Sequence, residues 1–314
     1  MTLHQPGIYA LPADTYHADP CAVPSLSSTI ARVLLDHSPL HAWTACRRLN
    51  PDHEPKNSKT FDIGRAAHRA VLGKGEAYAV CPEEFLASNG ALSTKAAKEW
   101  VEDMRAAGVT PVKQDEADAV QRMADAVRKH LSAMRITLDP ARSELTALGE
   151  IDGTWCRAMI DNAPADPRLP LYDLKTTTDA NPEGLARTIT NYGYDVQARF
   201  YLDAWRAATG ESRRFRFIFV EKEPPHAVSV VELLDDPNEP ADWMLTAASQ
   251  CDEARRLWRE CLAADHWPGY PPKVAVVGAP AWHAQKWADR SIGNPIPPKP
   301  SPETVARVAA WQAP

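Results

Sequence analysis

Two residues that could act on a phosphate, Asp173 and Lys175, stand two positions apart in a strand-like run. In a strand, residues i and i+2 share a face, so both side chains project together while Leu174 faces the core. A second acid, Asp161, ends the preceding strand-like run, and a hairpin would bring it close to Asp173. Carboxylates about 4–5 Å apart repel each other, and a divalent cation with oxygen ligands relieves that repulsion. The pattern predicts a Mg²⁺ or Mn²⁺ site at which Lys175 stabilises negative charge developing on phosphate.

A D-x-K pair alone is weak evidence, because its ordinary interpretation is an exposed ion pair on a hairpin, worth about 0–1 kcal/mol. Two further motifs strengthen it. Downstream, Gln197 and Tyr201 form a Q-x-x-x-Y pattern that places both side chains on one face of a helix. Upstream, Gly64 and His68 form G-x-x-x-H in a helical stretch, where the glycine would allow close approach and the imidazole could bind metal. Each motif also has a structural interpretation, so the set carries the argument.

The elements that must position these residues follow from the hydrophobic periodicity. Helical spacing predicts helices over residues 27–43, 61–72, 93–107, 115–134, 196–208 and 242–263. Short apolar or alternating runs predict strands over residues 143–148, 154–161, 171–176, 215–220 and 228–233, with a proline-rich turn at 162–170. This order predicts an α/β (α+β-like) fold with a central mixed β-sheet flanked by helices.

One domain is expected over residues 1–288, with an N-terminal helical part at 1–140 and a catalytic core at 141–263. Residues 289–314 are predicted to be a proline-rich tail outside that domain. The run NPIPPKPSPE cannot form a helix or an interior strand, although the closing TVARVAAW could make a short amphipathic helix.

Composition sets the class of protein. The chain has 314 residues, of which 44% are hydrophobic and 24% charged, as expected for a globular protein with a substantial core. No apolar run or N-terminal leader predicts a membrane span or secretory signal, so we expect an intracellular protein. The six cysteines form no C-x-x-C pair, which predicts reduced, mostly buried thiols rather than disulfides, zinc or iron–sulfur sites. The net charge of −6 does not favour nucleic-acid binding, although a basic groove can lie on an acidic body.

Taken together, the motifs resemble those of the PD-(D/E)xK nuclease superfamily, in which an acid ends one strand and D-x-K lies on the next. With G-x-x-x-H upstream and Q-x-x-x-Y downstream, the chain is similar to the RecB-like branch. The ordered runs GIY, YH, FDIGRAAH, CRAMID, DLKTTTD, VQARFY, DHWP and APAW resemble the RecE-type exonuclease (exonuclease VIII) of prophages over roughly residues 5–288. The proline-rich turn after CRAMID departs from that family and should alter a loop rather than the chemistry.

The resemblance implies roles for individual residues. The implied metal ligands are His68, Asp161, Asp173 and the backbone carbonyl of Leu174. Lys175 would be the catalytic lysine, and Gln197 and Tyr201 would position the attacking water, the lysine or the scissile phosphate. Glu144 matches the family's additional acidic position less securely, and Glu150 competes with it.

The resemblance also implies a function. The chain would be a Mg²⁺-dependent double-stranded DNA exonuclease, with Mn²⁺ able to substitute, one or two ions per site, and no iron–sulfur cluster or ATP. It would degrade the 5′-ended strand and leave 3′ overhangs for phage-type recombination, as a ring-like tetramer in the bacterial cytoplasm, encoded by a phage or prophage. A RecT-like annealing protein is the implied partner, and the tail could dock it or could have no role. The alternatives are an endonuclease of the same fold and a catalytically silent DNA-binding or assembly protein.

A ring-shaped nuclease would need basic residues along its channel. Candidate residues follow the D-x-K strand: Arg187, Arg199, Arg206, Arg213, Arg214 and Arg216. Reversing the charge at Arg213 and Arg214 should then weaken DNA binding and flatten its salt dependence. The alternative is an ordinary solvated helix and loop face.

Overall fold

The computed structural model describes residues 2–54, 59–236, 238 and 242–293. By its internal contacts the chain divides into two compact units, Met1–Tyr270 and Pro271–Pro314. Helix α10 (Ala281–Gly293) lies in the second unit. From residue 294 onward, the predicted proline-rich tail and its short helix fall outside the described residues. The predicted extent of the catalytic domain, 1–288, stays a prediction.

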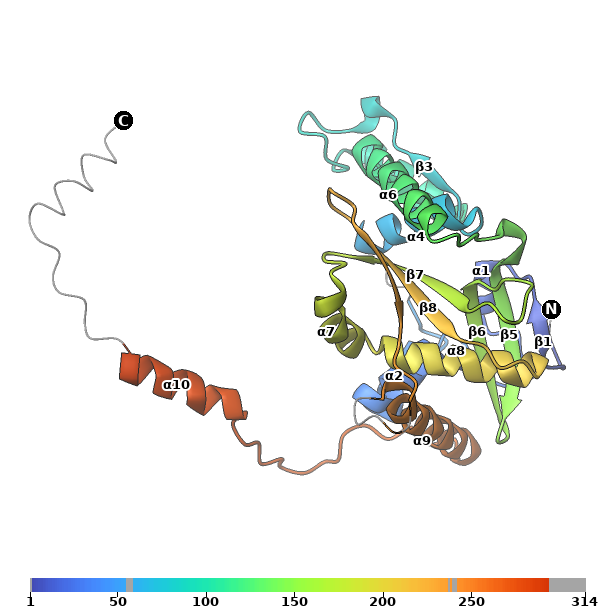
Figure 1. Cartoon of the computed structure of the whole chain (residues 1–314), viewed down its shortest axis with the longest axis vertical. Coiled ribbons are helices and arrows are strands. Elements are labelled where there is room, and N and C mark those ends of the chain that lie inside the picture. Colours follow the sequence, from blue (N-terminus) through green and yellow to red (C-terminus); the bar gives the residue numbers. More distant parts are fainter. Residues whose placement is uncertain (1, 55–58, 237, 239–241, 294–314) are drawn as a thin grey trace, which may run out of the picture. The chain divides into compact units, whose positions relative to one another are not determined.

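The first unit is built around a seven-stranded sheet in the order β1-β5-β6-β7-β8-β9, with β2 paired to β6 off this path (Figure 1). The β1–β5, β5–β6, β6–β7 and β8–β9 pairs are antiparallel, whereas the β7–β8 and β2–β6 pairs are parallel. The strands are β1 (Gly7–Tyr9), β2 (Leu26–Ser27), β5 (Ser143–Ile151), β6 (Thr154–Asn162), β7 (Leu171–Thr177), β8 (Phe215–Glu221) and β9 (Val228–Glu232). A separate parallel pair joins β3 (Tyr78–Val80) and β4 (Thr110–Val112).

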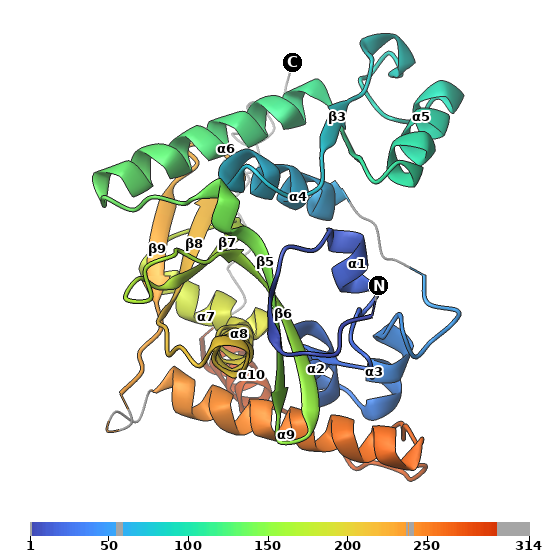
Figure 2. The same ribbon diagram turned by 90° about the vertical axis from the view of Figure 1, so that its right-hand side faces the viewer.

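Helices cover both faces of this sheet (Figure 2). On one face α8 (Tyr194–Thr209) packs on β5 and β6, and α2 (Ser28–Asp36) and α9 (Trp243–Ala264) pack on α8. On the other face α4 (Lys59–Leu72) and α6 (Gln114–Ala133) pack together and contact β7, β8 and β9. The remaining elements are α1 (Ala13–His17), α3 (Pro39–Ala45), α5 (Lys95–Ala106), α7 (Pro182–Tyr192) and short 3₁₀ turns at Glu83–Phe85 and Pro140–Arg142. The predicted mixed sheet with flanking helices is confirmed.

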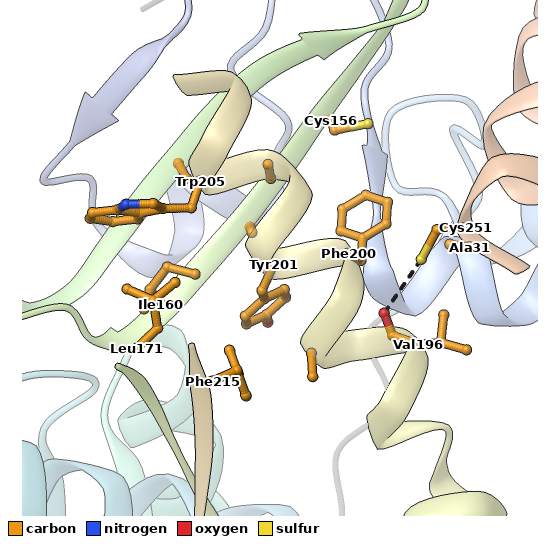
Figure 3. Close-up of a cluster of buried hydrophobic side chains, with 14 of the residues drawn as sticks. Ala31, Cys156, Ile160, Leu171, Val196, Phe200, Tyr201, Trp205, Phe215 and Cys251 are labelled. Carbon is orange, nitrogen blue, oxygen red and sulfur yellow. Dashed lines mark hydrogen bonds between the residues drawn. The ribbon is translucent and has the colours of Figure 1, made fainter. Parts of the chain in front are cut away.

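Alternation along β8 divides the core between the two faces. The odd-numbered residues of β8 belong to the cluster beneath α8: Phe215, Phe217 and Phe219. Ile218 and Val220 belong to the cluster beneath α4 and α6. Figure 3 shows Phe200, Tyr201 and Trp205 of α8 packed into the first cluster. Helix α8 is therefore a buried helix whose position relative to the sheet is closely constrained.

The helix predicted at 27–43 is in fact two helices, α2 and α3, with a break at His37 and Ser38. The Ser38 hydroxyl accepts a hydrogen bond from the His41 amide, and Pro39 occupies the first turn of α3, where a missing amide hydrogen costs nothing. The sequence analysis also missed α7, α1 and the short strands β1 to β4.

All six cysteines are free and buried, which confirms the prediction of buried thiols. None of the helices in the described residues is both long and apolar enough to span a lipid bilayer.

Candidate active site

His68 on α4 and Asp161 on β6 meet beside the backbone of β7. The His68 Nε2 atom lies 2.7 Å from the Leu174 carbonyl oxygen and 3.2 Å from Asp161 Oδ2. The Leu174 amide donates a hydrogen bond to the same Asp161 oxygen at 2.7 Å. Three possible ligand atoms, an imidazole nitrogen, a carboxylate oxygen and a backbone carbonyl oxygen, therefore gather from three separate elements.

Asp173 and Lys175 project together from β7, as their two-residue spacing predicts. The Lys175 Nζ atom lies 2.6 Å from Asp173 Oδ2, and Gln197 Nε2 on α8 donates a hydrogen bond to Asp173 Oδ1 at 2.8 Å. The Asp173 side chain is 2% exposed and that of Lys175 is 16% exposed. The D-x-K strand and the Q-x-x-x-Y helix are therefore joined at one buried carboxylate.

Burial dominates the protonation equilibria of this site. It raises the pKa of Asp161 to about 6, an effect that Lys175 partly opposes. It also raises the pKa of Asp173 to about 6, and the Asp161 carboxylate adds to that rise. Burial and then the Lys175 charge lower the pKa of His68 to about 4, so its imidazole is neutral at physiological pH. Burial alone would lower the pKa of Lys175, but Asp173 and Asp161 outweigh it and raise that pKa.

The donor set suits a divalent cation. Among the described residues, the buried Asp173 Oδ2 contacts the Lys175 ammonium and has no other partner. Neutral imidazole, carboxylate and carbonyl groups are all ligands that Mn²⁺ accepts, and Mg²⁺ prefers the oxygens. Within the described part of the chain, no three His, Cys, Asp or Glu side chains are already gathered into a ligand cage. Instead, His68 contacts the Leu174 carbonyl oxygen and Asp161 accepts from the Leu174 amide, while Asp173 is held by Lys175 and Gln197.

Of the two acids proposed on β5, Glu144 lies at the site and Glu150 does not. In the β5–β6 ladder Ser143 pairs with Asn162 and Leu145 pairs with Ile160, which places Glu144 opposite Asp161. The backbone φ of 51° at Glu144 interrupts the ladder at this point. Burial raises the pKa of Glu144, and the neighbouring carboxylate of Glu76 adds to this. Glu150 is exposed, near the turn at the far end of the hairpin.

Tyr201 lies one helical turn beyond Gln197, with 8% of its surface exposed and its ring packed edge-on against Phe215. Burial, helped by the carboxylates of Asp173 and Asp161, raises the pKa of Tyr201 well above its usual value. The hydroxyl therefore stays protonated, which leaves it able to donate a hydrogen bond near the site.

The prediction that Arg213 lines a DNA channel is wrong. Its side chain is 1% exposed, and its Nη1 donates to the carbonyl oxygens of Pro164, Asp166 and Leu169 at 2.8–3.2 Å. Its other nitrogens donate to Glu211, and its guanidinium lies over the Trp205 ring. Arg213 therefore closes the proline-rich turn after β6, and its buried guanidinium is engaged through all three of its nitrogens.

The other predicted arginines differ in their availability. Arg214 is 57% exposed and lies 3.5 Å from Glu232, whereas Arg216 is 25% exposed and donates to the same carboxylate at 2.6 Å. Arg199 pairs with Asp203 at 2.9 Å. Arg187 and Arg206 are exposed on α7 and α8.

The sequence analysis missed a cavity of about 960 Å³ whose lining includes Glu144 but not His68, Asp161, Asp173 or Lys175. Glu144 lies in its wall and interacts electrostatically with Asp161, so the cavity adjoins the site. Basic and acidic side chains both line it, and Arg65 and Arg105 form ion pairs with Asp62. The basic residues include His17, Arg47, Arg65, Lys74, Arg105 and Arg157, and the acidic ones are Asp14, Glu76 and Glu144. Arg157 could have been found, because it lies four residues before Asp161 on one strand and therefore shares its strand face.

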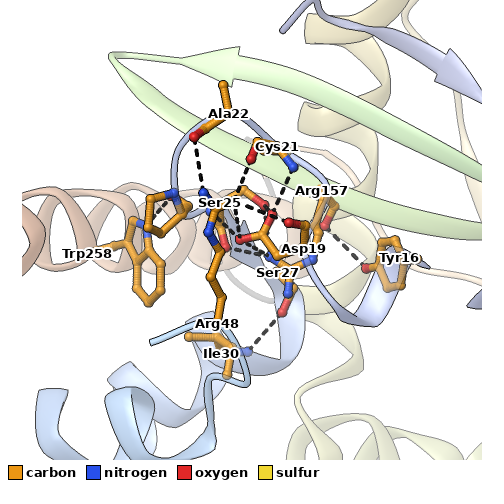
Figure 4. A network of polar contacts seen from close by, with 11 residues as sticks. Tyr16, Asp19, Cys21, Ala22, Ser25, Ser27, Ile30, Arg48, Arg157 and Trp258 are labelled. Atoms are coloured by element: carbon orange, nitrogen blue, oxygen red, sulfur yellow. Dashed lines mark hydrogen bonds and ion pairs between the residues drawn. The ribbon is translucent and has the colours of Figure 1, made fainter. Parts of the chain in front are cut away.

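Arg157 is anchored in a buried polar network (Figure 4). Its Nη1 donates to the Ser25 carbonyl at 2.6 Å and to the Ser25 hydroxyl at 2.8 Å, and lies 3.4 Å from the Asp19 carboxylate. Its Nε is buried with no hydrogen-bond partner, and its guanidinium lies over the Tyr16 ring. The network fixes the N-terminal segment as a wall of the cavity and leaves the buried Nε donor of Arg157 unused.

The expected role of Gly64 in close helix approach is also wrong. A Cβ at this position would meet Thr176 Oγ1 at 3.9 Å, which is an ordinary contact. The fully buried Ala66 and Ala67 are the residues that allow α4 to pack tightly.

A family model described as a PDDEXK-like domain of unknown function (DUF3799) matches residues 34–279. No curated protein matches the sequence. A candidate exonuclease from Eubacterium rectale has a similar structure, with 12% identity and a TM-score of 0.57, covering 89% of this chain and 99% of that chain. Two further structures match. A phage-related exonuclease from Haemophilus somnus has 12% identity and a TM-score of 0.31, and the match covers 68% of this chain and 91% of that chain. An alkaline exonuclease from Laribacter hongkongensis has 13% identity and a TM-score of 0.24, and the match covers 66% of this chain and 99% of that chain. The first likeness supports the fold, and the other two are too distant to support an argument.

Proposed function

The chain belongs to the family of PDDEXK-like domains of unknown function (DUF3799), and from that membership and the site's geometry we propose that it is a divalent-metal-dependent nuclease acting on DNA. One observation carries the proposal. The buried Asp173 carboxylate, the partly buried Asp161 carboxylate, a neutral imidazole, a charged lysine and an amide converge from α4, β6, β7 and α8, and Glu144 connects them to a partly basic cavity. A structural ion pair would need the lysine and one acid, and it would leave the second acid and the histidine without a purpose.

Each residue has a chemical role under this proposal. His68, Asp161, Asp173 and the Leu174 carbonyl would hold the cation. A bound divalent cation neutralises the phosphate and lowers the pKa of the attacking water. Lys175 keeps its proton because the two carboxylates raise its pKa, and it presents positive charge where the phosphate gains negative charge.

The helix α8 completes the set. Gln197 orients the Asp173 carboxylate through its hydrogen bond, and the protonated Tyr201 hydroxyl offers a donor to the water or phosphate. Glu144 adds a carboxylate opposite Asp161, where it can hold a cation or a water molecule.

The finer proposal is a Mg²⁺-dependent exonuclease that degrades the 5′-ended strand of duplex DNA and leaves a 3′ overhang for recombination. It rests on the ordered RecE-type motifs, as do the ring-like tetramer, the RecT-like annealing partner and a place in the bacterial cytoplasm. The cavity supports a nucleic-acid substrate in spite of the net charge of −6, because Lys and Arg side chains outnumber Asp and Glu side chains in its lining.

A digestion of linear duplex carrying a label on either the 5′ or the 3′ end tests the proposal, with Mg²⁺, Mn²⁺ or EDTA. We expect cleavage that needs metal, with Asp173→Ala and Lys175→Ala each reducing the rate by about 10²-fold or more. Glu150→Ala is the matched control, because this acid is exposed and away from the site. Full activity in both site variants would refute the site, and the absence of any metal-dependent cleavage by the native protein would favour the silent DNA-binding alternative.

The same assay separates the finer alternatives. Closed circular DNA should survive if the enzyme needs an end, whereas an endonuclease would linearise it. Early release of the 5′ label supports the proposed polarity, and early release of the 3′ label contradicts it.

A further inference from the structure

Lys175 touches an aromatic ring that none of the motifs includes. Its Nζ atom lies 4.9 Å from the centroid of the Tyr194 ring and 6.0 Å from that of Phe217. An ammonium within about 6 Å of a ring face is attracted by the negative face of the π system, most strongly where water is excluded. The Lys175 side chain is 16% exposed, so its ammonium is held between the Asp173 carboxylate and the ring of Tyr194.

The Tyr194 ring is itself fixed in place. It packs against Phe217 and Phe219 of β8, with centroids 5.6 and 6.1 Å away, and stacks on Tyr192 at 5.5 Å. Tyr194 is the first residue of α8, directly after Gly193, whose φ of 57° ends α7 and begins α8. The sheet and the helix junction therefore determine where this ring lies.

We propose that Tyr194 is a positioning residue that holds the Lys175 ammonium in the active site through its ring face. Lys175 needs this second contact because Asp173 has two roles: it is the ion-pair partner of Lys175 and also a candidate metal ligand. A carboxylate that shares its charge with a cation attracts the lysine less strongly. The ring of Tyr194 does not compete for that cation, so it keeps its attraction for the ammonium. The inference rests on the proposed nuclease function and adds a residue to it.

Substitutions at residue 194 distinguish the electrostatic effect of the ring face from the packing effect of the ring's shape. Tyr194→Phe keeps the ring and should retain most of the rate. Pentafluorophenylalanine, incorporated at this position, keeps an apolar ring of similar shape but reverses its electrostatic face. We expect kcat to fall about threefold to thirtyfold with this residue, with KM and the urea midpoint nearly unchanged. An equal kcat for phenylalanine and pentafluorophenylalanine overturns the inference.

A second measurement needs neither metal nor activity. In Asp173→Asn the carboxylate charge is gone but its shape and an acceptor for Gln197 remain, so the lysine should be held by the ring and by the Asp161 charge, which is the same in every variant compared. NMR order parameters of ¹³Cε-labelled lysine should show Lys175 ordered in this variant and mobile once pentafluorophenylalanine replaces Tyr194. Tyr192→Leu is the control and should leave Lys175 ordered. If Lys175 is already mobile in Asp173→Asn, the inference is overturned. If the native protein cleaves no DNA, the proposed function is refuted, but the NMR measurement still decides whether Tyr194 holds Lys175.

Discussion

Replacing Asp161 with asparagine should stabilise the metal-free protein at neutral pH. Burial raises the pKa of Asp161 from 3.8 to about 6, so an ionised Asp161 opposes folding. A rise of about two units corresponds to about 3 kcal/mol at 1.36 kcal/mol per unit. We expect about 1–3 kcal/mol, because the side chain is 16% exposed and water screens part of the effect. Asparagine has the same shape and still offers an oxygen to the Leu174 amide.

The sign of the pH dependence follows from linkage. The pKa of Asp161 is higher in the folded than in the unfolded protein, so its favourable contribution is full below pH 3.8 and is lost as the pH rises through about 6. The advantage of Asp161→Asn should therefore vanish near pH 4 and be complete above about pH 7. His68 has the opposite dependence: burial lowers its pKa to about 4, so its contribution is full above 6.5 and is lost as the pH falls. His68 contacts residue 161 directly, so its own contribution differs between the two proteins below pH 6.5, and the size of the advantage is therefore compared above that pH, where the imidazole is neutral.

Urea unfolding in EDTA, followed between pH 4 and pH 8, measures this difference. Adding Mg²⁺ should then stabilise the native protein, by RT ln(1 + [L]/Kd), and should not stabilise Asp161→Asn. Glu150→Gln serves as the control, because its exposed carboxylate should change neither result. The reasoning fails if Asp161→Asn is no more stable than the native protein at pH 8, or if its advantage is the same at every pH.

Three further predictions concern the residues around the site. Arg213→Ala should lower the free energy of unfolding by about 2–4 kcal/mol in urea titrations, since it removes the buried guanidinium that donates to three carbonyl oxygens and to Glu211, while the salt slope of DNA binding of the folded protein stays unchanged. Gly75→Ala should cost about 1–3 kcal/mol by the same assay, because the φ of 109° strains an alanine and its Cβ would lie 2.5 Å from a Glu144 oxygen. Glu144→Gln should reduce metal-dependent cleavage in the end-label assay, whereas Glu150→Gln should not; equal rates would exclude Glu144 from the site.

The local pattern of the chain predicted the elements that carry the chemistry. Alternation identified β7 and the shared direction of Asp173 and Lys175, and helical spacing identified the helix with Gln197 and Tyr201. These predictions succeed because each depends on one element, where periodicity of two or 3.6 residues decides which side chains share a face. Their roles in catalysis stay predictions.

The parts that sequence could not supply depend on contacts between distant segments. The cavity wall joins the N-terminal segment to β6 through Arg157, Ser25 and Asp19, and no local pattern pairs them. Arg213 carries the positive charge expected of a DNA contact, but the turn after β6 places three carbonyl oxygens around its guanidinium. Gly64 suggested close packing that the neighbouring alanines provide instead.

The position of the D-x-K pair depends more on β8 than on the hairpin from which we first inferred it. In the described residues β6 pairs with β7 at Asn162 and Tyr172, whereas β7 pairs with β8 continuously from Leu171↔Phe215 to Thr177↔Glu221. A shift of one residue in that parallel register would turn the two charged side chains toward the cluster beneath α4 and α6 and place Leu174 in the site. The burial of Tyr172 and Leu174 in that cluster opposes such a shift, and the phenylalanines of β8, buried beneath α8, fix the strand against which β7 is aligned. Two of those same phenylalanines pack against the Tyr194 ring that supports Lys175, so the register of the sheet and the position of the lysine are stabilised by one aromatic cluster.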